Sequence, residues 1–308
     1  MTELDEATRR LVRGARLPPF LYAIGPADAR RAFGLIQTPP GELPDLVHRT
    51  VELAAPGGPV AIHLLIPREP APAPRPVILY AHGGGWLIGG WATHHRLAVR
   101  MCRDTGAIVV MPEYTRVPEA RHPVAVSQVA ATLAWIRAGG LPARADLDRV
   151  ALAGDCAGAT MTLSVALRDR AAGHPALRAQ VLLNPMGRPA PQDRSARQFA
   201  TGAGLRLADV RDLHQRYAPD RYADPLAATD LAGLPPTLLI TAEADVTRDV
   251  AERLGARLRA AGVAVTAARY LGTVHDFAVL DALRWTPAAI AALGQVAEHL
   301  RRAFGEPP

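Results

Sequence analysis

A candidate nucleophile lies in the pentapeptide Gly154-Asp155-Cys156-Ala157-Gly158. This Gly-x-nucleophile-x-Gly pattern is typical of a sharp strand-to-helix turn that exposes its central side chain, usually a serine hydroxyl and here the thiol of Cys156. Glycine is needed at both ends because a Cβ there would crowd the backbone of the turn. The flanks agree, since residues 149–153 are an apolar run suited to a buried strand and residues 161–167 can continue as a helix. The pattern therefore predicts a nucleophilic thiol at position 156.

A second motif, His82-Gly83-Gly84-Gly85-Trp86, directly follows a strand-like run at residues 77–81. Consecutive glycines after a buried strand let the backbone approach a ligand closely and turn its N–H groups toward it, which is the geometry of an oxyanion hole. A flexible glycine-rich loop is the alternative interpretation. It does not account for the strand, the histidine and the turn at Cys156 occurring together, so we favour the oxyanion hole.

An acid and a histidine should follow such a nucleophile along the chain, in that order. The next buried strand is predicted at residues 236–242 and runs into Asp245, which we predict as the acid. Glu243 and Asp249 stay as alternatives, since Glu243 is within reach of the strand end and Asp249 would lie one turn into the next helix. Of the ten histidines, His275 alone falls late in the chain on a strand-to-helix loop, after a strand predicted at residues 264–270. We therefore predict His275 as the base.

Together these motifs resemble those of the hormone-sensitive-lipase-like family of bacterial esterases, the branch that carries HGGG and GDSAG, and within it the acetyl-esterase type. The similarity extends from about Val77 to Phe277 and includes the segments at residues 113–123 and 233–245. It implies an α/β-hydrolase fold with Cys156 as nucleophile, His275 as base and Asp245 as the orienting acid. It also implies that the oxyanion is held by the backbone amides of Gly83, Gly84, Gly85 and Ala157.

The sequence also departs from the family pattern around the site. Cys156 replaces the family serine, Ala159-Thr160 replaces the usual Gly-Asn after the turn, the acid motif is altered at residues 246–250, and the usual His-Gly-Phe is His275-Asp276-Phe277. The helix N-terminus and His275 are expected to favour a thiolate at Cys156. A thiolate is also a good leaving group, so the tetrahedral intermediate of an alkyl ester would tend to return to substrate. Thioesters and other activated acyl donors escape that penalty.

Three interpretations of Cys156 stay open. It is the natural nucleophile of a hydrolase or acyltransferase, or an engineered Ser-to-Cys change in an ordinary esterase, or part of a protein that binds its ligand without covalent chemistry. Our first hypothesis is an acyl hydrolase, for a carboxylic ester or thioester of a short-chain or acetylated small molecule, acting through the Cys156-His275-Asp245 triad and a covalent acyl-enzyme. The alternative is transfer or elimination of the acyl group in small-metabolite biosynthesis.

Composition and pattern predict one α/β domain over residues 1–308. The 49% of hydrophobic residues suffice for a large core, and strands alternate with helices after a hairpin at residues 49–53 and 60–66, as in a doubly wound, mostly parallel sheet. The family fold implies eight strands and a helical cap. The cap elements are expected at about residues 1–45, with a helix over 2–16, and at 187–220, with a helix over 207–217.

The charge and cysteine content exclude several other classes of function. The net charge of +6 is spread without a basic block, so we expect no nucleic-acid partner. The acidic N-terminus and the lack of a long apolar window predict a cytoplasmic protein without a membrane partner. The partner expected is a small-molecule acyl substrate, and a homodimer is left open.

No cofactor and no metal are expected, because neither a second cysteine nor a histidine pair lies near the turn with ligand spacing. His94-His95, next to Trp91, is expected to line the loop rather than bind zinc, and a surface pair at a helix start is the plainer interpretation. Cys102, the other cysteine of the two, is predicted to be a buried small hydrophobe.

Overall fold

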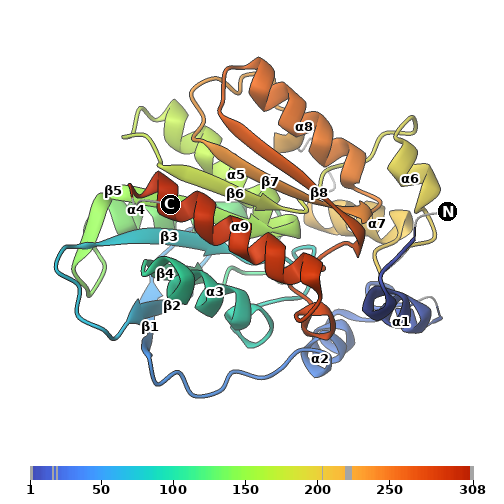
Figure 1. Cartoon of the computed structure of the whole chain (residues 1–308), viewed down its shortest axis with the longest axis horizontal. Helices are drawn as coiled ribbons and strands as arrows, with labels where there is room; N and C mark the ends of the chain where they lie inside the picture. Colours follow the sequence, from blue (N-terminus) through green and yellow to red (C-terminus); the bar gives the residue numbers. More distant parts are fainter. Residues whose placement is uncertain (1–2, 16, 19, 203, 219–223, 306–308) are drawn as a thin grey trace.

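The centre of the structure, a computed structural model that describes residues 3–15, 17–18, 20–202, 204–218 and 224–305, is an eight-stranded sheet (Figure 1). Its strand order is β1-β2-β4-β3-β5-β6-β7-β8. The antiparallel pairs are β1 with β2 and β2 with β4, and all other neighbours are parallel. The strands are β1 (Leu46–Leu53), β2 (Val60–Pro67), β3 (Arg75–Ala81), β4 (Ile108–Pro112), β5 (Ala145–Asp155), β6 (Ala179–Leu183), β7 (Thr237–Ala244) and β8 (Val265–Val274). The predicted α/β-hydrolase fold is confirmed.

Helices cover both faces of this sheet, which explains why its inner strands are continuous apolar runs. Alternate residues of β3 show the two cores: Val77 and Leu79 pack with one, and Ile78 and Tyr80 with the other. The first core is shared with α4 (Val124–Arg137), α5 (Cys156–Ala171) and α8 (Arg248–Ala260). The second is shared with α3 (Trp91–Thr105) and α9 (Pro287–Ala303).

Short helices lie at the end of the sheet where the parallel strands finish (Figure 1). They are α1 (Glu6–Ala15), α2 (Pro26–Leu35), α6 (Arg194–Gln198) and α7 (Leu207–Tyr217). Single 3-10 turns are η1 (Pro225–Ala227), which contacts α5 and α8, and η2 (Asp281–Leu283), which contacts α1. The helix predicted over 207–217 is α7. The helix predicted over 2–16 is α1, and residues 2 and 16 lie outside the described residues, as do 1, 19, 203, 219 and 220 of the expected cap elements.

Within the described ranges, no helix combines the length and the apolar character needed to cross a membrane.

Candidate active site

The turn between β5 and α5 holds Cys156 in a left-handed conformation with φ +50°, which is uncommon for a residue with a Cβ. The flanking glycines make the turn possible. A Cβ on Gly158 would lie 2.0 Å from the carbonyl oxygen of Ala81, and one on Gly154 would lie 2.5 Å from the backbone of Gly158. The thiol is 1% exposed and points from the N-terminus of α5 into the end of the sheet. This is the strained, close-packed turn that the pentapeptide predicts.

The predicted acid and base meet because β7 and β8 are adjacent parallel strands. Asp245 follows β7, His275 follows β8, and Nδ1 of His275 lies 2.7 Å from Oδ2 of Asp245. The other carboxylate oxygen accepts from the backbone N–H and the hydroxyl of Thr247, at 2.8 and 2.9 Å. Burial alone would raise the pKa of Asp245, but these partners hold it below its usual value. An ionised Asp245 keeps the proton on Nδ1 and leaves Nε2 of His275 for the nucleophile.

The two other acids considered from the sequence have different partners. Glu243 accepts a hydrogen bond from the backbone of Gly272 at 2.8 Å, and Asp249 accepts one from the backbone of Ser195 at 2.8 Å. Both therefore support neighbouring loops, and of these three acids Asp245 is the one that contacts the imidazole.

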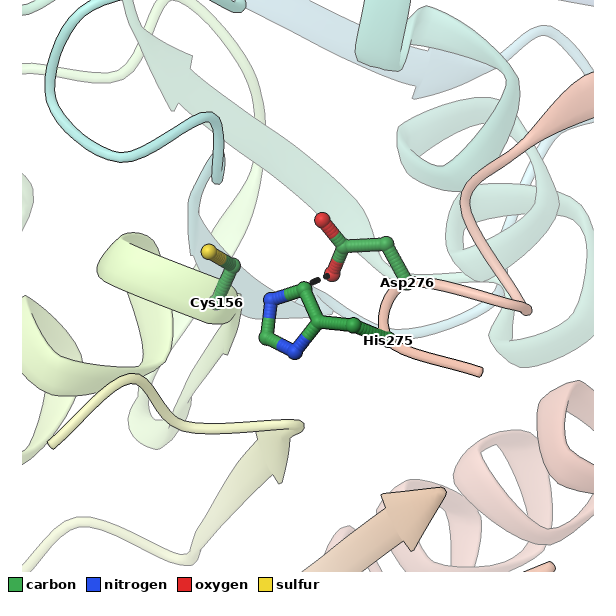
Figure 2. A group of neighbouring side chains, drawn as sticks. All are labelled: Cys156, His275 and Asp276. Carbon is green, nitrogen blue, oxygen red and sulfur yellow. Dashed lines mark ion pairs between the residues drawn. The ribbon is translucent and has the colours of Figure 1, made fainter. Parts of the chain in front are cut away.

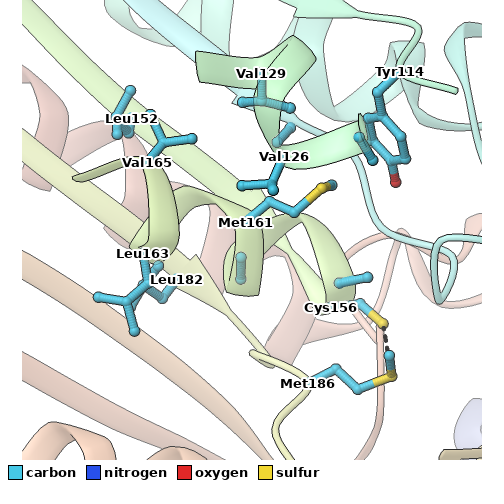
Figure 3. Close-up of a cluster of buried hydrophobic side chains, with 14 of the residues drawn as sticks. Tyr114, Val126, Val129, Leu152, Cys156, Met161, Leu163, Val165, Leu182 and Met186 are labelled. Atoms are coloured by element: carbon cyan, nitrogen blue, oxygen red, sulfur yellow. Dashed lines mark hydrogen bonds between the residues drawn. The ribbon is translucent and has the colours of Figure 1, made fainter. Parts of the chain in front are cut away.

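The thiol of Cys156 lies close to His275 but its recorded contact is with another sulfur. Its Sγ lies 3.9 Å from Sδ of Met186 (Figure 3). The sulfur of Cys156, a ring nitrogen of His275 and a carboxylate oxygen of Asp276 all lie within 4.8 Å of one another (Figure 2). The structure thus places the thiol beside the imidazole, and His275 acts to lower the pKa of Cys156 through its charge and a side-chain hydrogen bond.

Asp276 is the residue of this site whose contacts sequence reasoning missed. Its backbone has φ +58°, a conformation that glycine, Asn and Asp tolerate best, and its carboxylate reaches back over the imidazole. Oδ1 of Asp276 lies 3.6 Å from Nε2 of His275, and neither atom has a hydrogen-bond partner within the described residues. The signal was available, because an acid replaces the family glycine directly after the predicted base.

The carboxylate of Asp276 changes the proton affinity of the whole group. Burial raises the pKa of Cys156, and the charge of Asp276 raises it further, while His275 lowers it only in part. Burial lowers the pKa of His275, but the charges of Asp245 and Asp276 outweigh burial and raise it well above the usual value. Burial raises the pKa of Asp276 itself to about 6. The structure therefore does not favour the resting thiolate expected from the sequence, because the desolvated thiol faces a carboxylate.

The glycine loop after β3 lies directly against the nucleophile. A Cβ on Gly83 would be 2.9 Å from Cβ of Cys156, so the loop backbone approaches as closely as the missing side chain allows. Gly84 and Gly85 have φ +99° and +61°. In the part of the chain that the structure describes, no acceptor is recorded for the amides of Gly83, Gly84 or Gly85. The amide of Ala157 belongs to the first turn of α5, where helix N–H groups have no intrahelical partner. These donors are available to a ligand.

An apolar pocket of about 270 Å³ opens onto the site. His275 and Asp276 line it on the sheet side, and side chains from residues 11–36, 204–209 and 280 form the rest, among them Leu11, Phe20, Tyr22, Phe33, Leu205 and Leu280. Arg206 of its wall donates to Asp209 at 2.8 Å and lies 3.6 Å above the ring of Phe20, whereas Oδ1 of Asp276 has no hydrogen-bond partner within the described residues. The pocket therefore offers mainly apolar surface, with the carboxylate of Asp276 at its sheet side.

Two expectations for side chains near the site have different outcomes. Cys102 is buried in α3, as expected, and donates to the carbonyl of Ala107 at 3.2 Å. The surface position considered for His94-His95 is wrong, because α3 buries both rings. The expectation that the pair lines the loop holds for His94, whose ring centroid lies 5.2 Å from that of His82 at the start of the glycine loop. Nε2 of His94 lies 3.5 Å from Oδ2 of Asp155.

The chain belongs to the α/β-hydrolase-fold family, whose model matches residues 78–279. It is similar to the carboxylesterase NlhH of Mycobacterium tuberculosis, with 32% identity over 301 residues that cover 92% of each chain. An acetyl-hydrolase of Streptomyces hygroscopicus is 32% identical over 247 residues, covering 77% of this chain and 75% of that protein. The crystal structure of a thermostable esterase from Pseudomonas putida superimposes with a TM-score of 0.91, at 33% identity and 98% coverage of both chains. The chain is thus a carboxylesterase-like α/β-hydrolase.

Proposed function

We propose that this protein hydrolyses esters or thioesters of short-chain or acetylated small molecules through Cys156, His275 and Asp245. One observation supports this proposal above all others. A buried thiol at a left-handed turn lies within 4.8 Å of an imidazole whose far nitrogen is fixed by a buried carboxylate at 2.7 Å. The relatives named as esterases and as an acetyl-hydrolase suggest the class of substrate.

The reaction begins when Sγ of Cys156 attacks the carbonyl carbon. His275 accepts the thiol proton on Nε2 while the carbonyl oxygen takes the negative charge, facing the amides of Gly84, Gly85 and Ala157, with Gly83 beside them. His275 then donates this proton to the leaving alkoxide or thiolate, and the acyl group stays on sulfur. Water attacks the acyl-enzyme, His275 takes its proton, and that proton returns to Sγ as the acid is released.

The pocket limits the substrate to a small one. Its volume of about 270 Å³ lies just below the range of roughly 300 to 1,000 Å³ that is common for ligand sites. A pocket near the lower end of this range suits an acetyl or short acyl group with a modest alcohol or thiol portion. A mainly apolar wall with the carboxylate of Asp276 at its sheet side favours an uncharged group next to the scissile bond.

A second candidate, acyl transfer to a small amine, alcohol or thiol, is favoured by the burial of the nucleophile. Cys156 is 1% exposed and lies below an apolar pocket, so an acceptor that fills the pocket would exclude water from the thioester. Adding candidate acceptors to the reaction and measuring how the acyl group divides between acid and acylated acceptor tests this. Acid as the sole product at every acceptor concentration would leave hydrolysis as the reaction.

The test of the proposal combines turnover with identification of the acyl-enzyme. The protein is mixed with a chromogenic acetyl ester and separately with an acetyl thioester, and samples are quenched for intact mass and peptide mapping. We expect one acetyl group on Cys156, a faster reaction with the thioester, and the same adduct in the control variant Cys102→Ser. Turnover without an adduct on Cys156, or ligand binding without turnover, would refute the covalent mechanism.

A further inference from the structure

Three side chains around the nucleophile offer ligand atoms to a common point. Cys156, His275 and Asp276 each contribute one atom to a group that spans no more than 4.8 Å, and within the described residues this is the one such group of three (Figure 2). The side chains of His275 and Asp276 are 6% and 12% exposed. Nε2 of His275 and Oδ1 of Asp276 are buried without a hydrogen-bond partner in the described part of the chain. Buried polar atoms of this kind normally have a partner, so these two need an explanation.

The separations suit a tetrahedral zinc ion. Zinc binds cysteine sulfur at about 2.3 Å and histidine nitrogen or carboxylate oxygen at about 2.0–2.2 Å, which places neighbouring ligand atoms roughly 3.3–3.7 Å apart. Nε2 of His275 and Oδ1 of Asp276 are already 3.6 Å apart. All three ligand atoms lie within 4.8 Å of one another, so the sulfur of Cys156 has to approach by no more than about an ångström to reach zinc-ligand spacing.

The surroundings also suit a dication. Asp245 receives the Nδ1–H of His275 at 2.7 Å, which is the carboxylate–histidine arrangement that orients a histidine ligand toward a metal. Asp155, next to Cys156 in the chain, adds a further buried carboxylate, whose Oδ1 accepts from the hydroxyl of Tyr80 at 2.6 Å and whose Oδ2 lies 3.5 Å from Nε2 of His94. Two positive charges would offset the repulsion among Asp155, Asp245 and Asp276.

We propose that Cys156, His275 and Asp276 bind a thiophilic divalent cation, Zn²⁺ in the first place, and that this ion caps the nucleophile. On binding, the S–H bond breaks, its proton leaves to solvent, and the thiolate, the neutral imidazole and the carboxylate each donate an electron pair to the metal. The fourth position faces the pocket, which His275 and Asp276 line. The bound ion occupies both Sγ and Nε2, so neither can take part in acyl transfer. This inhibition rests on the proposed function, whereas the binding does not.

Cobalt titration of the full chain tests the binding directly. Co²⁺ bound by a thiolate gives a near-ultraviolet sulfur-to-cobalt charge-transfer band, and Zn²⁺ displaces it. We expect the band in the wild-type protein and in Cys102→Ser, which removes the other cysteine and retains a hydroxyl for the carbonyl of Ala107. We expect its loss in Cys156→Ser and an affinity at least about 100-fold weaker in Asp276→Asn, beyond the range for residues that only orient a ligand. Wild-type affinity in Asp276→Asn, or no band in the wild type, would overturn the site.

The capping is tested by two readouts, one of which does not need acyl chemistry. One equivalent of Zn²⁺ should slow alkylation of Cys156 by iodoacetamide and stop ester turnover, and a chelator should restore both. Protection from alkylation in a protein without ester turnover would support the metal site while the proposed function fails. Ester turnover that zinc does not inhibit would support the proposed function while the metal site fails. Unchanged alkylation, or faster turnover with zinc, would overturn the capping.

Discussion

Replacing Asp276 with asparagine should shift the pH profile of the enzyme toward acid. Asparagine tolerates the left-handed backbone at this position and retains the shape of the side chain, so the change removes mainly a negative charge. That charge lies 3.6 Å from Nε2 of His275. With an effective dielectric constant of about 20, a pair of unit charges at this distance interacts by about 4–5 kcal/mol, equivalent to about three pKa units. Water and the new amide will replace part of this interaction energy, so we expect the pKa of His275 to fall by at least about one unit.

The direction of the shift in the pH profile follows from the protonation state in which His275 reacts. The imidazole must be neutral to accept the thiol proton, so kcat/KM rises as pH rises through its pKa. Asp276 raises that pKa, and the wild-type limb should therefore lie above the ordinary histidine value of 6.5. Without the carboxylate the limb moves to lower pH and activity at neutral pH increases.

The assay is kcat/KM for an acetyl thioester over a broad pH range, with circular dichroism to show that each variant is folded. Asp28→Asn is the matched control, because Asp28 is an exposed acid on α2 that pairs with Arg31. Its profile should coincide with that of the wild type. An acidic limb in Asp276→Asn that stays in place or moves to higher pH would refute the electrostatic reasoning.

Three further predictions concern the nucleophile, the base and the turn. Cys156→Ser should raise turnover of alkyl esters at alkaline pH and lower turnover of thioesters. With serine as nucleophile, the tetrahedral intermediate no longer contains an enzyme thiolate that leaves more readily than the alkoxide of the ester. The ratio of ester to thioester turnover measures the effect, and an unchanged ratio would contradict the prediction. His275→Ala should lower kcat/KM by about 10³-fold or more, measured with the same substrates, if the three residues act as a unit; near-wild-type turnover would remove His275 from the mechanism. Gly158→Ala should lower the free energy of unfolding by about 3 kcal/mol or more, because its Cβ would meet the Ala81 carbonyl at 2.0 Å. The control Gly294→Ala, in open space on α9, should raise the free energy of unfolding by about 0.4–1 kcal/mol. Equal melting temperatures of the two variants would show that the turn tolerates a side chain.

The parts of the structure that local rules specify could be predicted from the sequence. The pentapeptide around Cys156 predicts its turn because the two glycines have a steric reason that does not depend on distant residues. The order of nucleophile, acid and histidine predicts that Asp245 and His275 lie at strand ends, and the pairing of β7 with β8 then places them side by side. The fold follows from the alternation of apolar strands and helices.

The parts that depend on contacts between distant segments could not be predicted in this way. The pocket combines residues 11–36 with 204–209 and 275–280, and no local pattern says that these segments meet. The carboxylate of Asp276 lies 3.6 Å from Nε2 of His275 on a left-handed backbone, an arrangement that no local pattern predicts. Burial and the charge of Asp276 raise the pKa of Cys156, which is why helix position alone gave the opposite expectation.

The two main departures from the family pattern, Cys156 and Asp276, both lie beside the imidazole of His275. Their effects on the reaction should therefore be coupled. A serine hydroxyl is far less acidic than a thiol, so it depends more strongly on a neutral His275, and Asp276 favours the charged ring. At neutral pH, Cys156→Ser alone should consequently gain little ester hydrolysis, and the double variant Cys156→Ser, Asp276→Asn should exceed the product of the two single effects. A double-mutant cycle on kcat/KM for the acetyl ester measures this coupling. Effects that multiply without excess would mean that the thiol and the carboxylate influence the reaction independently, and that His275 does not link them.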